Sequence, residues 1–205
     1  MLRGASGDEP VLGLVLCGGE SRRMGRDKAR VELGGRTLLE RAFGVLEPLC
    51  DEVLLASGPA PRYLEFGRQE VLDRRPPGSG ALAGIEAGLW SLRGRAAQGW
   101  LLVLACDMPG VDTALLGRLL GRARAERLDL VLLESERGPE PLAGVWSAVL
   151  LESVRASLDA GEAKLTAPLG FAAHGGSLPR VGWERVELAR VRNLNTPADL
   201  EGALA

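Results

Sequence analysis

Three cations close to a pair of glycines form the part of this sequence best suited to chemistry. Arg22, Arg23 and Lys28 stand within seven positions of one another, just after Gly18-Gly19. The apolar run from Val11 to Cys17 precedes the glycines and predicts a buried strand. Glycine has no Cβ, so its backbone N–H groups can approach a ligand closely, and neighbouring cations neutralise phosphate charge. The stretch therefore predicts a phosphate-binding loop that follows a strand.

Two common phosphate-binding patterns do not fit this loop. The dinucleotide pattern G-x-G-x-x-G needs a glycine directly after Gly19, where Glu20 stands. The P-loop pattern G-x-x-x-x-G-K-[ST] fails because Arg26 and Asp27 follow Gly25. The sequence predicts instead a longer loop whose cations surround a polyphosphate. The alternative at this point is a strand that ends in a surface turn with solvated arginines.

Two aspartates follow other apolar runs. Asp73 directly follows the run 69–72, and Asp107 follows the run 100–105 after one cysteine. Because ligands of an open parallel sheet bind outside the carboxyl ends of its strands, we expect both carboxylates to face the phosphate loop. Magnesium favours one or two carboxylates together with phosphate oxygens, so these acids predict a magnesium site. The alternative is that each acid is only a turn residue before a proline-containing loop.

The apolar patterns alternate between strands and helices along the chain. Strands are predicted over residues 11–17, 52–56, 69–72, 100–105, 128–133 and 141–146. Helices are predicted after Thr37, from Ala81 to about Leu92, after Asp112, from Ser147 to about Leu158, and after Thr196. Residues 163–173 show weak helical spacing, and the region 161–192 is otherwise not assigned. Alternation of this kind predicts an α/β fold with a mostly parallel sheet covered on both faces.

Length and composition limit the class of protein. A chain of 205 residues with 46% hydrophobic content predicts a single domain over 1–205, with residues 1–10 as a frayed N-terminus. The net charge of −2 argues against a general nucleic-acid binder. No apolar run reaches the roughly 18 residues of a membrane span, and the start lacks the apolar region of a signal peptide. These features predict a cytoplasmic location and no membrane or nucleic-acid partner.

The cysteines and the one histidine fall outside any metal pattern. Cys17, Cys50 and Cys106 are odd in number and widely spaced, so they form neither a disulfide framework nor a zinc pattern. We predict that they are small buried apolar residues. An alternative places Cys17 and Cys106 close together at the mouth of the site, where bound nucleotide would slow their alkylation. His174 is outside every motif and is predicted to lie on the surface.

The segments Leu16-Cys17-Gly18-Gly19 and Ser21-x-Arg23-Met24-Gly25-x-Asp27-Lys28 together resemble the signature of molybdenum cofactor guanylyltransferases. The match continues in order from Leu14 to Leu200, and Cys17 departs from it where alanine is usual. The resemblance implies a three-layer αβα sandwich with a mostly parallel Rossmann-like sheet of the nucleotide-diphospho-sugar transferase type. It also implies a single nucleotidyltransferase domain.

Roles for individual residues follow from this resemblance. It implies that one set of residues binds the nucleotide: Leu16, Cys17, Gly18, Gly19, Lys28, Ala56, Asp73 and Asp107. Asp107 matches the aspartate that holds magnesium, and the segment 80–84 resembles one that borders the nucleotide. Asn193 and Asn195 resemble residues of a late segment near the acceptor pterin.

The implied reaction transfers GMP from GTP to the terminal phosphate of the molybdenum-molybdopterin cofactor and releases pyrophosphate. A phosphate monoester has a second pKa near about 6, so the attacking phosphate is already largely ionised and needs no general base. Catalysis would then depend on Lys28, Arg22 and Arg23, which neutralise charge, and on Asp107. The implied cofactor is Mg²⁺, with Mn²⁺ as a substitute. Transient contact with molybdoenzymes or their chaperones is a further implied partner interaction.

Two alternatives stay open from the sequence. The first is another nucleotidyltransferase, either a molybdopterin cytidylyltransferase or a sugar-phosphate nucleotidyltransferase. The double glycine after Cys17 favours the guanine branch by resemblance. The second is a nucleotide-binding protein without catalytic activity, and the presence of both Lys28 and Asp107 argues against it.

Overall fold

The structure is a computed structural model that describes residues 9–18, 27–76, 78–173, 175–196 and 199–200. Several residues singled out in the sequence lie outside the described residues: Gly19, Arg22, Arg23, Met24, Gly25, His174 and Pro197. The predicted frayed terminus lies outside as well, apart from residues 9 and 10. Their assignments therefore stay predictions.

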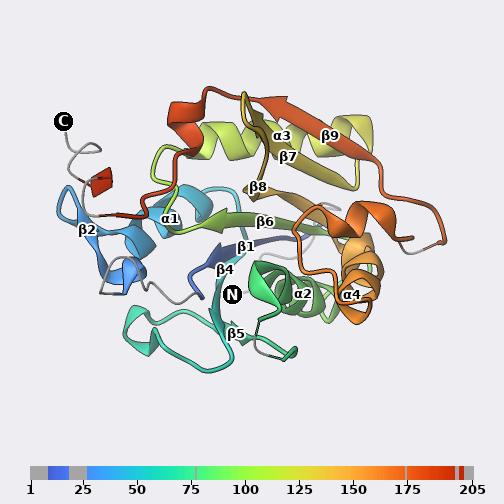
Figure 1. The fold of residues 1–205 in the computed structure, drawn as a ribbon, viewed down its shortest axis with the longest axis horizontal. Helices are drawn as coiled ribbons and strands as arrows, with labels where there is room; N and C mark the ends of the chain where they lie inside the picture. Colours follow the sequence, from blue (N-terminus) through green and yellow to red (C-terminus); the bar gives the residue numbers. More distant parts are fainter. Residues whose placement is uncertain (1–8, 19–26, 77, 174, 197–198, 201–205) are drawn as a thin grey trace.

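A seven-stranded sheet forms the centre of the molecule (Figure 1). Its strands are β1 (Val11–Leu16), β4 (Glu52–Gly58), β5 (Glu70–Leu72), β6 (Trp100–Ala105), β7 (Leu130–Ser135), β8 (Gly138–Ser147) and β9 (Val181–Arg185). They lie in the order β5-β4-β1-β6-β8-β7-β9. Only β8 is antiparallel, to both β6 and β7, while the other neighbours pair in parallel. The prediction of a mostly parallel sheet is confirmed.

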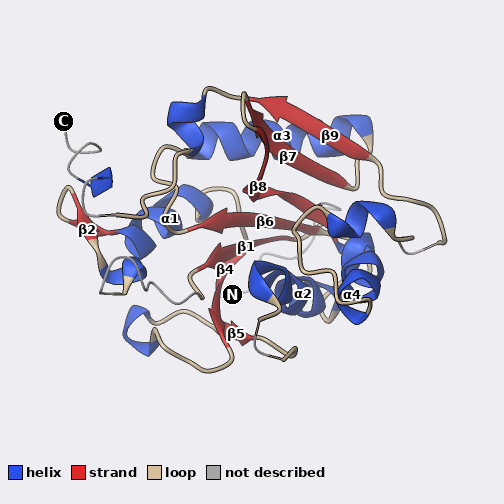
Figure 2. Ribbon diagram, viewed as in Figure 1, coloured by secondary structure: helices blue, strands red, loops and turns tan. Residues whose placement is uncertain are grey.

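Helices cover both faces of this sheet (Figure 2). They are α1 (Leu38–Leu46), α2 (Gly80–Arg93), α3 (Thr113–Glu126) and α4 (Leu151–Asp159). Helices α1 and α3 contact each other and pack on one face, whereas α2 packs on the other with α4 against it. This arrangement confirms the predicted three-layer αβα sandwich.

Short elements connect the layers. Residues 32–37 form a hairpin of β2 (Glu32–Leu33) and β3 (Arg36–Thr37). The 3₁₀ turns of the described residues are η1 (Lys28–Arg30), η2 (Leu64–Phe66), η3 (Ala148–Leu150), η4 (Ala167–Gly170) and η5 (Leu188–Val191). Gly34 and Gly35 form the hairpin turn with φ values of 63° and 77°, a conformation that glycine adopts without strain. The hairpin leads directly into α1.

Helix starts agree with the capping signals of the sequence. Thr37 and Glu40 form a capping box at α1, and the Asp112 carboxylate accepts from the Leu115 backbone N–H at the start of α3. Thr196 and Asp199 make the same reciprocal contacts, although the helix they would open lies mostly outside the described residues. These caps satisfy backbone N–H groups that a helix start leaves unpaired.

The central strands are buried along their whole length, which explains their apolar sequences. Every residue of β1 and β6 is buried. Helix α2 approaches them closely because Gly88 has no side chain: a Cβ there would lie 2.9 Å from methyl groups of Leu14 and Leu101. The register aligns Leu16 with Ala56 on one side and with Ala105 on the other. Three strand ends therefore lie side by side.

Two regions differ from the sequence prediction. Strand β9 (Val181–Arg185) was not predicted, because it lies at the sheet edge, is mostly half-buried and carries no apolar run. The helix suggested by the weak helical spacing over 163–173 does not form, and this region contains only the short turn η4. Edge segments of this kind receive less of the burial that imposes a clear pattern on a sequence.

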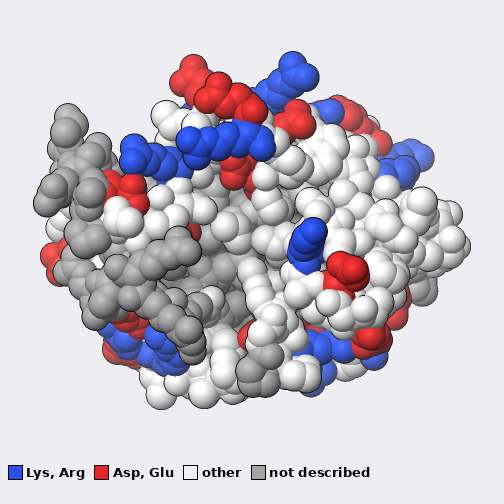
Figure 3. Space-filling view, in the orientation of Figure 1, with Lys and Arg blue, Asp and Glu red and all other residues white. Residues whose placement is uncertain are grey.

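Charge and apolar length can be judged for the described residues. None of their helices is long and apolar enough to cross a membrane. On the face shown in Figure 3, the described charged side chains lie mainly around the edge and uncharged atoms fill much of the middle.

Candidate active site

The ends of β1 and β4 border a small, open pocket. It is lined by Leu16, Gly18, Ala56, Gly58, Asp73, Gly80, Ala81 and Gly84. Four residues predicted to bind nucleotide thus share one pocket: Leu16, Gly18, Ala56 and Asp73. Glycine and alanine provide most of its walls, so backbone atoms and small side chains line the pocket.

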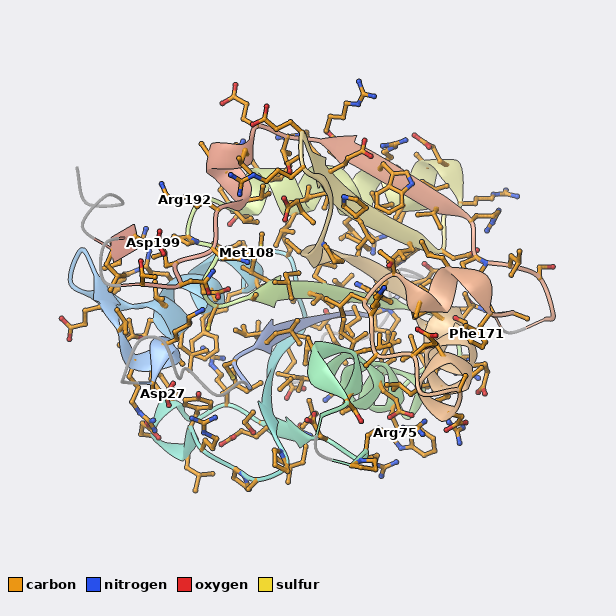
Figure 4. All side chains as sticks on the ribbon, viewed as in Figure 1. Asp27, Arg75, Met108, Phe171, Arg192 and Asp199 are labelled. Atoms are coloured by element: carbon orange, nitrogen blue, oxygen red, sulfur yellow. The ribbon has the colours of Figure 1, made fainter. Side chains whose placement is uncertain are left out.

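Lys28 and Asp107 lie in direct contact beside this region. The Lys28 ammonium Nζ is 2.7 Å from Asp107 Oδ2 and 2.6 Å from Asn195 Oδ1. The side chains of Lys28 and Asp107 are 19% and 14% exposed, so solvent reaches both and weakens their attraction only in part. The predicted juxtaposition of the lysine and the aspartate is present. Figure 4 shows Asp27 and Met108, the sequence neighbours of the two residues, on the same side of the molecule.

The late segment 193–196 reaches the lysine from the other end of the chain. The Leu194 backbone N–H donates to the Asp107 carbonyl at 2.9 Å, and the Leu194 side chain is buried among Val31, Leu33, Leu38 and Leu200. Sequence reasoning placed Asn195 near the acceptor but did not predict its contact with Lys28. The only signal available was the motif itself, because the two residues are 167 positions apart.

The absence of a side chain at Gly18 allows β1 and β4 to approach each other closely. Its backbone N–H donates to the Ala56 carbonyl at 2.8 Å, and the Cys17 N–H donates to the same oxygen at 3.1 Å. The Gly18 N–H is thus paired within the protein, while Gly19, the other glycine expected to approach a ligand, lies outside the described residues. A Cβ at Gly18 would lie 2.9 Å from the Gly58 backbone nitrogen, so only glycine fits this close approach of β1 and β4.

A buried charge network borders Asp73. Glu86 of α2 is 4% exposed and accepts from Arg75 Nε at 2.8 Å and from Arg75 Nη2 at 2.5 Å. Arg75 also pairs with Asp159 of α4, and it lies at the edge of the molecule in Figure 4. Burial and the neighbouring Glu86 raise the pKa of the Asp73 carboxyl above its usual range. The network fixes the loop that follows Asp73, and the sequence signal for it was the single acid within α2.

The residues present fit a cation that is shared with a substrate. The described residues contain no group of three or more acids, histidines or cysteines that could hold a metal ion by themselves. Asp107 offers one partly exposed carboxylate next to the lysine. One carboxylate plus phosphate oxygens is a donor set that magnesium uses, because it retains several waters and needs few protein ligands.

The surroundings of the three thiols keep them protonated and therefore unreactive. Cys17 and Cys106 are buried and Cys50 is half-buried, which largely confirms the prediction of buried cysteines. The Cys17 thiol donates to the Ala56 carbonyl at 3.3 Å. Burial raises the pKa of the Cys17 thiol far above its usual range, and it raises the pKa values of Cys50 and Cys106 to about 12.

We expect Ellman's reagent to label the folded protein at pH 8 at least about a hundredfold more slowly than the unfolded chain, because thiolate is the reactive form. A raised pKa keeps the thiol protonated until the pH approaches that value, so rates should rise steeply only in strongly alkaline buffer. Labelling is followed by absorbance with and without denaturant. Fast labelling of the folded protein at pH 8 would contradict the described burial.

Comparison with known proteins gives concordant matches. The family model described as "MobA-like NTP transferase domain" matches residues 13–174. The molybdenum cofactor guanylyltransferase of Nitrobacter hamburgensis is 38% identical over 152 residues, which are 73% of each chain. The molybdopterin-guanine dinucleotide biosynthesis protein A of Archaeoglobus fulgidus superposes with a TM-score of 0.75 at 25% identity, over 94% of this chain and 96% of that one. A Mycobacterium tuberculosis protein solved as a complex with manganese has the same fold, with a TM-score of 0.66 at 21% identity over 95% of this chain and 98% of that one.

Proposed function

The chain belongs to the MobA-like NTP transferase family, and from this membership we propose that it is a molybdenum cofactor guanylyltransferase. The reaction transfers GMP from GTP to the terminal phosphate of molybdenum-molybdopterin and releases pyrophosphate. The observation that carries the proposal is the contact of Lys28 with Asp107 and Asn195, which lies beside the pocket at the ends of β1 and β4.

Lys28 supplies positive charge for the phosphates of GTP. Two oxygen acceptors hold its ammonium, so its position is set before substrate binds. Such pre-organisation favours the transition state, in which negative charge moves onto the leaving pyrophosphate. Gly19, Arg22 and Arg23 are proposed to contact the same phosphates from the preceding loop. The acceptor phosphate attacks in line without a general base because it is already largely ionised.

Asp107 is proposed to hold Mg²⁺, with Mn²⁺ as a substitute. The bound ion would neutralise charge on phosphate oxygens of the nucleotide. The Asp107 carboxylate also keeps the Lys28 ammonium in place, so this one side chain serves both cations. Magnesium dependence of GTP binding and of turnover tests the assignment.

The pocket between β1, β4 and α2 is proposed to receive the guanosine part of GTP. Leu16 and Gly18 form one edge of this pocket, and Ala56 leaves room because its side chain is small. The Asp73 carboxylate lies in the same pocket and can accept hydrogen bonds from base or ribose. The engaged N–H of Gly18 means that this residue contributes shape rather than a donor.

Asn193 is proposed to contact the acceptor. Its Oδ1 atom is buried and has no hydrogen-bond partner among the described residues. Leaving a buried acceptor unpaired costs about 1–3 kcal/mol, so a ligand that offers an N–H group would remove this cost. The pterin ring of the proposed acceptor carries such groups, which supports the role implied by the motif.

We expect Asn195→Ala to lower kcat about tenfold while changing the KM for the acceptor less than about threefold, because it removes one bond that positions Lys28. Asn193→Ala serves as the matched comparison and is expected to raise the acceptor KM instead. Steady-state kinetics with varied acceptor separates the two. An acceptor KM that rises in Asn195→Ala at unchanged kcat would assign Asn195 to acceptor binding.

Pyrophosphate release with a panel of nucleotides tests the proposed function. GTP with magnesium and molybdenum-molybdopterin should support release, and CTP, UTP and ATP should not. Release with CTP would indicate a cytidylyltransferase, and release with UTP and a sugar phosphate would indicate a sugar-phosphate enzyme. Thermal stabilisation by GTP without any release would indicate a binding protein.

Location and further partners complete the proposal. Three free cysteines suit a reducing compartment, and we infer a cytoplasmic enzyme. Its product is a dinucleotide cofactor, so we infer transient contact with molybdoenzymes or the chaperones that receive it. Co-purification of the product with such a protein tests this contact.

A further inference from the structure

Tyr63, the only tyrosine of the chain, connects the segments on both sides of the phosphate-loop sequence. Its side chain is 0% exposed. The hydroxyl oxygen lies 3.1 Å from the carbonyl oxygen of Cys17, directly after β1, and 3.0 Å from Asp27 Oδ1, directly before Lys28. One hydroxyl thus contacts two residues that are ten positions apart in the signature motif.

Several contacts fix the tyrosine itself. The Glu70 carboxylate accepts from the backbone N–H groups of Arg62 and Tyr63 at 2.8 and 2.9 Å and so ties this segment to β5. The guanidinium groups of Arg30 and Arg62 lie 5.1 and 5.4 Å from the ring centroid, within the range of cation–π attraction. The ring also meets Phe66 edge-on at 6.3 Å. The hydroxyl is therefore presented from a rigid support.

Asp27 transmits this position to the lysine. Its Oδ1 atom accepts from the Ala29 backbone N–H at 3.1 Å and caps the turn η1, of which Lys28 is the first residue. Its Oδ2 atom accepts from Arg30 at 2.7 Å and from Arg62 at 3.3 Å. Because the turn fixes the Lys28 backbone, the orientation of Asp27 determines where the lysine side chain begins.

Phenylalanine could not replace the hydroxyl. Both neighbours of the phenol, a carbonyl and a carboxylate, are acceptors, so the hydroxyl is the donor and its single proton is shared between them. Burial, followed by the proximity of Cys17 and Asp27, raises the pKa of the Tyr63 hydroxyl far above its usual range. The proton therefore stays on the oxygen throughout the neutral range, and the contact does not change with pH there.

We propose that Tyr63 is a positioning residue for nucleotidyl transfer: its hydroxyl joins the carbonyl after β1 to Asp27 and thereby sets where the Lys28 ammonium stands relative to Asp107. The proposal rests on the proposed function insofar as Lys28 acts on the phosphates. Tyr63 touches neither Lys28 nor the pocket residues through its hydroxyl, so it acts only through Asp27 and Cys17.

Tyr63→Phe removes one oxygen atom and keeps the ring. The matched control is Ser153→Ala, which removes another buried hydroxyl that donates to a backbone carbonyl, that of Leu150 in the α4 region. We expect both variants to melt at lower temperature than the parent. Only Tyr63→Phe should lower kcat, by about tenfold, with the KM for GTP changed less than about threefold, as for loss of a positioning contact.

A second readout does not depend on activity. The chain has only two lysines, Lys28 and Lys164, so protein labelled with ¹³C at lysine Cε gives two NMR signals, which Lys164→Arg assigns. We expect Tyr63→Phe to shift the Lys28 signal and to leave the Lys164 signal in place. Ser153→Ala should shift neither.

The outcomes decide between the possibilities. An unchanged Lys28 signal, or an equal fall of kcat in Ser153→Ala, would overturn the positioning role. If the parent protein released no pyrophosphate, the proposed function would fail while the NMR measurement still tested Tyr63. If Tyr63→Phe did not fold, Asp27→Ala would carry the test, since it removes the acceptor at the other end of the same bond. If neither the Lys28 NMR signal nor kcat changed in that variant, the proposal would also be overturned.

Discussion

Replacing Asp107 by alanine is expected to lower kcat for GMP transfer at least about a hundredfold, a typical loss when one electrostatic group of an active site is removed. Two effects combine. The variant loses the carboxylate proposed to hold Mg²⁺, and it loses the 2.7 Å contact that positions the Lys28 ammonium. Steady-state pyrophosphate release over a range of magnesium concentrations measures both.

Asp107→Asn is the informative companion variant. It keeps the size of the side chain and can still accept from Lys28, but it carries no charge to hold a divalent ion. We expect nearly the same loss of kcat and no rescue by more magnesium, because both variants lack the negative charge. The backbone contact of Leu194 with the Asp107 carbonyl is retained in both variants, so the segment itself stays in place. Near-normal turnover in either variant would remove Asp107 from the mechanism.

Replacing Lys28 by alanine is also expected to lower kcat at least about a hundredfold, since the leaving pyrophosphate would lose its pre-positioned counter-charge. The Lys28 ammonium lies between two acceptors, Asp107 and Asn195, within 2.7 Å. Removing it also leaves the Asp107 carboxylate without this partner. Kinetics and GTP affinity are measured for the same preparation, so that binding and turnover are separated.

Two controls accompany Lys28→Ala. Lys28→Arg keeps the charge but changes a compact ammonium into a planar group, so we expect it to restore activity only in part. Arg185→Ala removes a cation at the far edge strand β9, where the side chain is 92% exposed, and should leave kcat unchanged. A full rescue by arginine would show that charge alone is sufficient at this position.

The arrangement of the site explains why single substitutions should have large effects. Lys28, Asp107 and Asn195 come from three distant parts of the chain and meet at one ammonium group. Tyr63 supports the first of these parts from a fourth. Each group is held by contacts that the others provide, and we therefore expect double variants among them to be non-additive.

The sequence by itself determined the layers of the fold and the edge at which the site lies. Apolar runs such as 11–16 and 100–105 become strands buried on both faces, and burial on both faces requires an unbroken apolar sequence. Capping residues such as Thr37 and Asp112 marked helix starts because their contacts are local. Since parallel strands end at one edge, the positions of Asp73 and Asp107 after their strands followed from chain order.

Only the tertiary structure decided which polar atoms meet at that edge. The Asn195–Lys28 bond, the Tyr63 contacts and the Arg75–Glu86 pair join residues between 11 and 167 positions apart. A polar contact between distant segments imposes no periodicity on the sequence, so no pattern reveals it. The engaged N–H of Gly18 is a similar case, because it depends on how closely β4 approaches β1. Burial imposes an apolar pattern on the sequence of each element, whereas the packing of whole elements determines which polar groups contact each other.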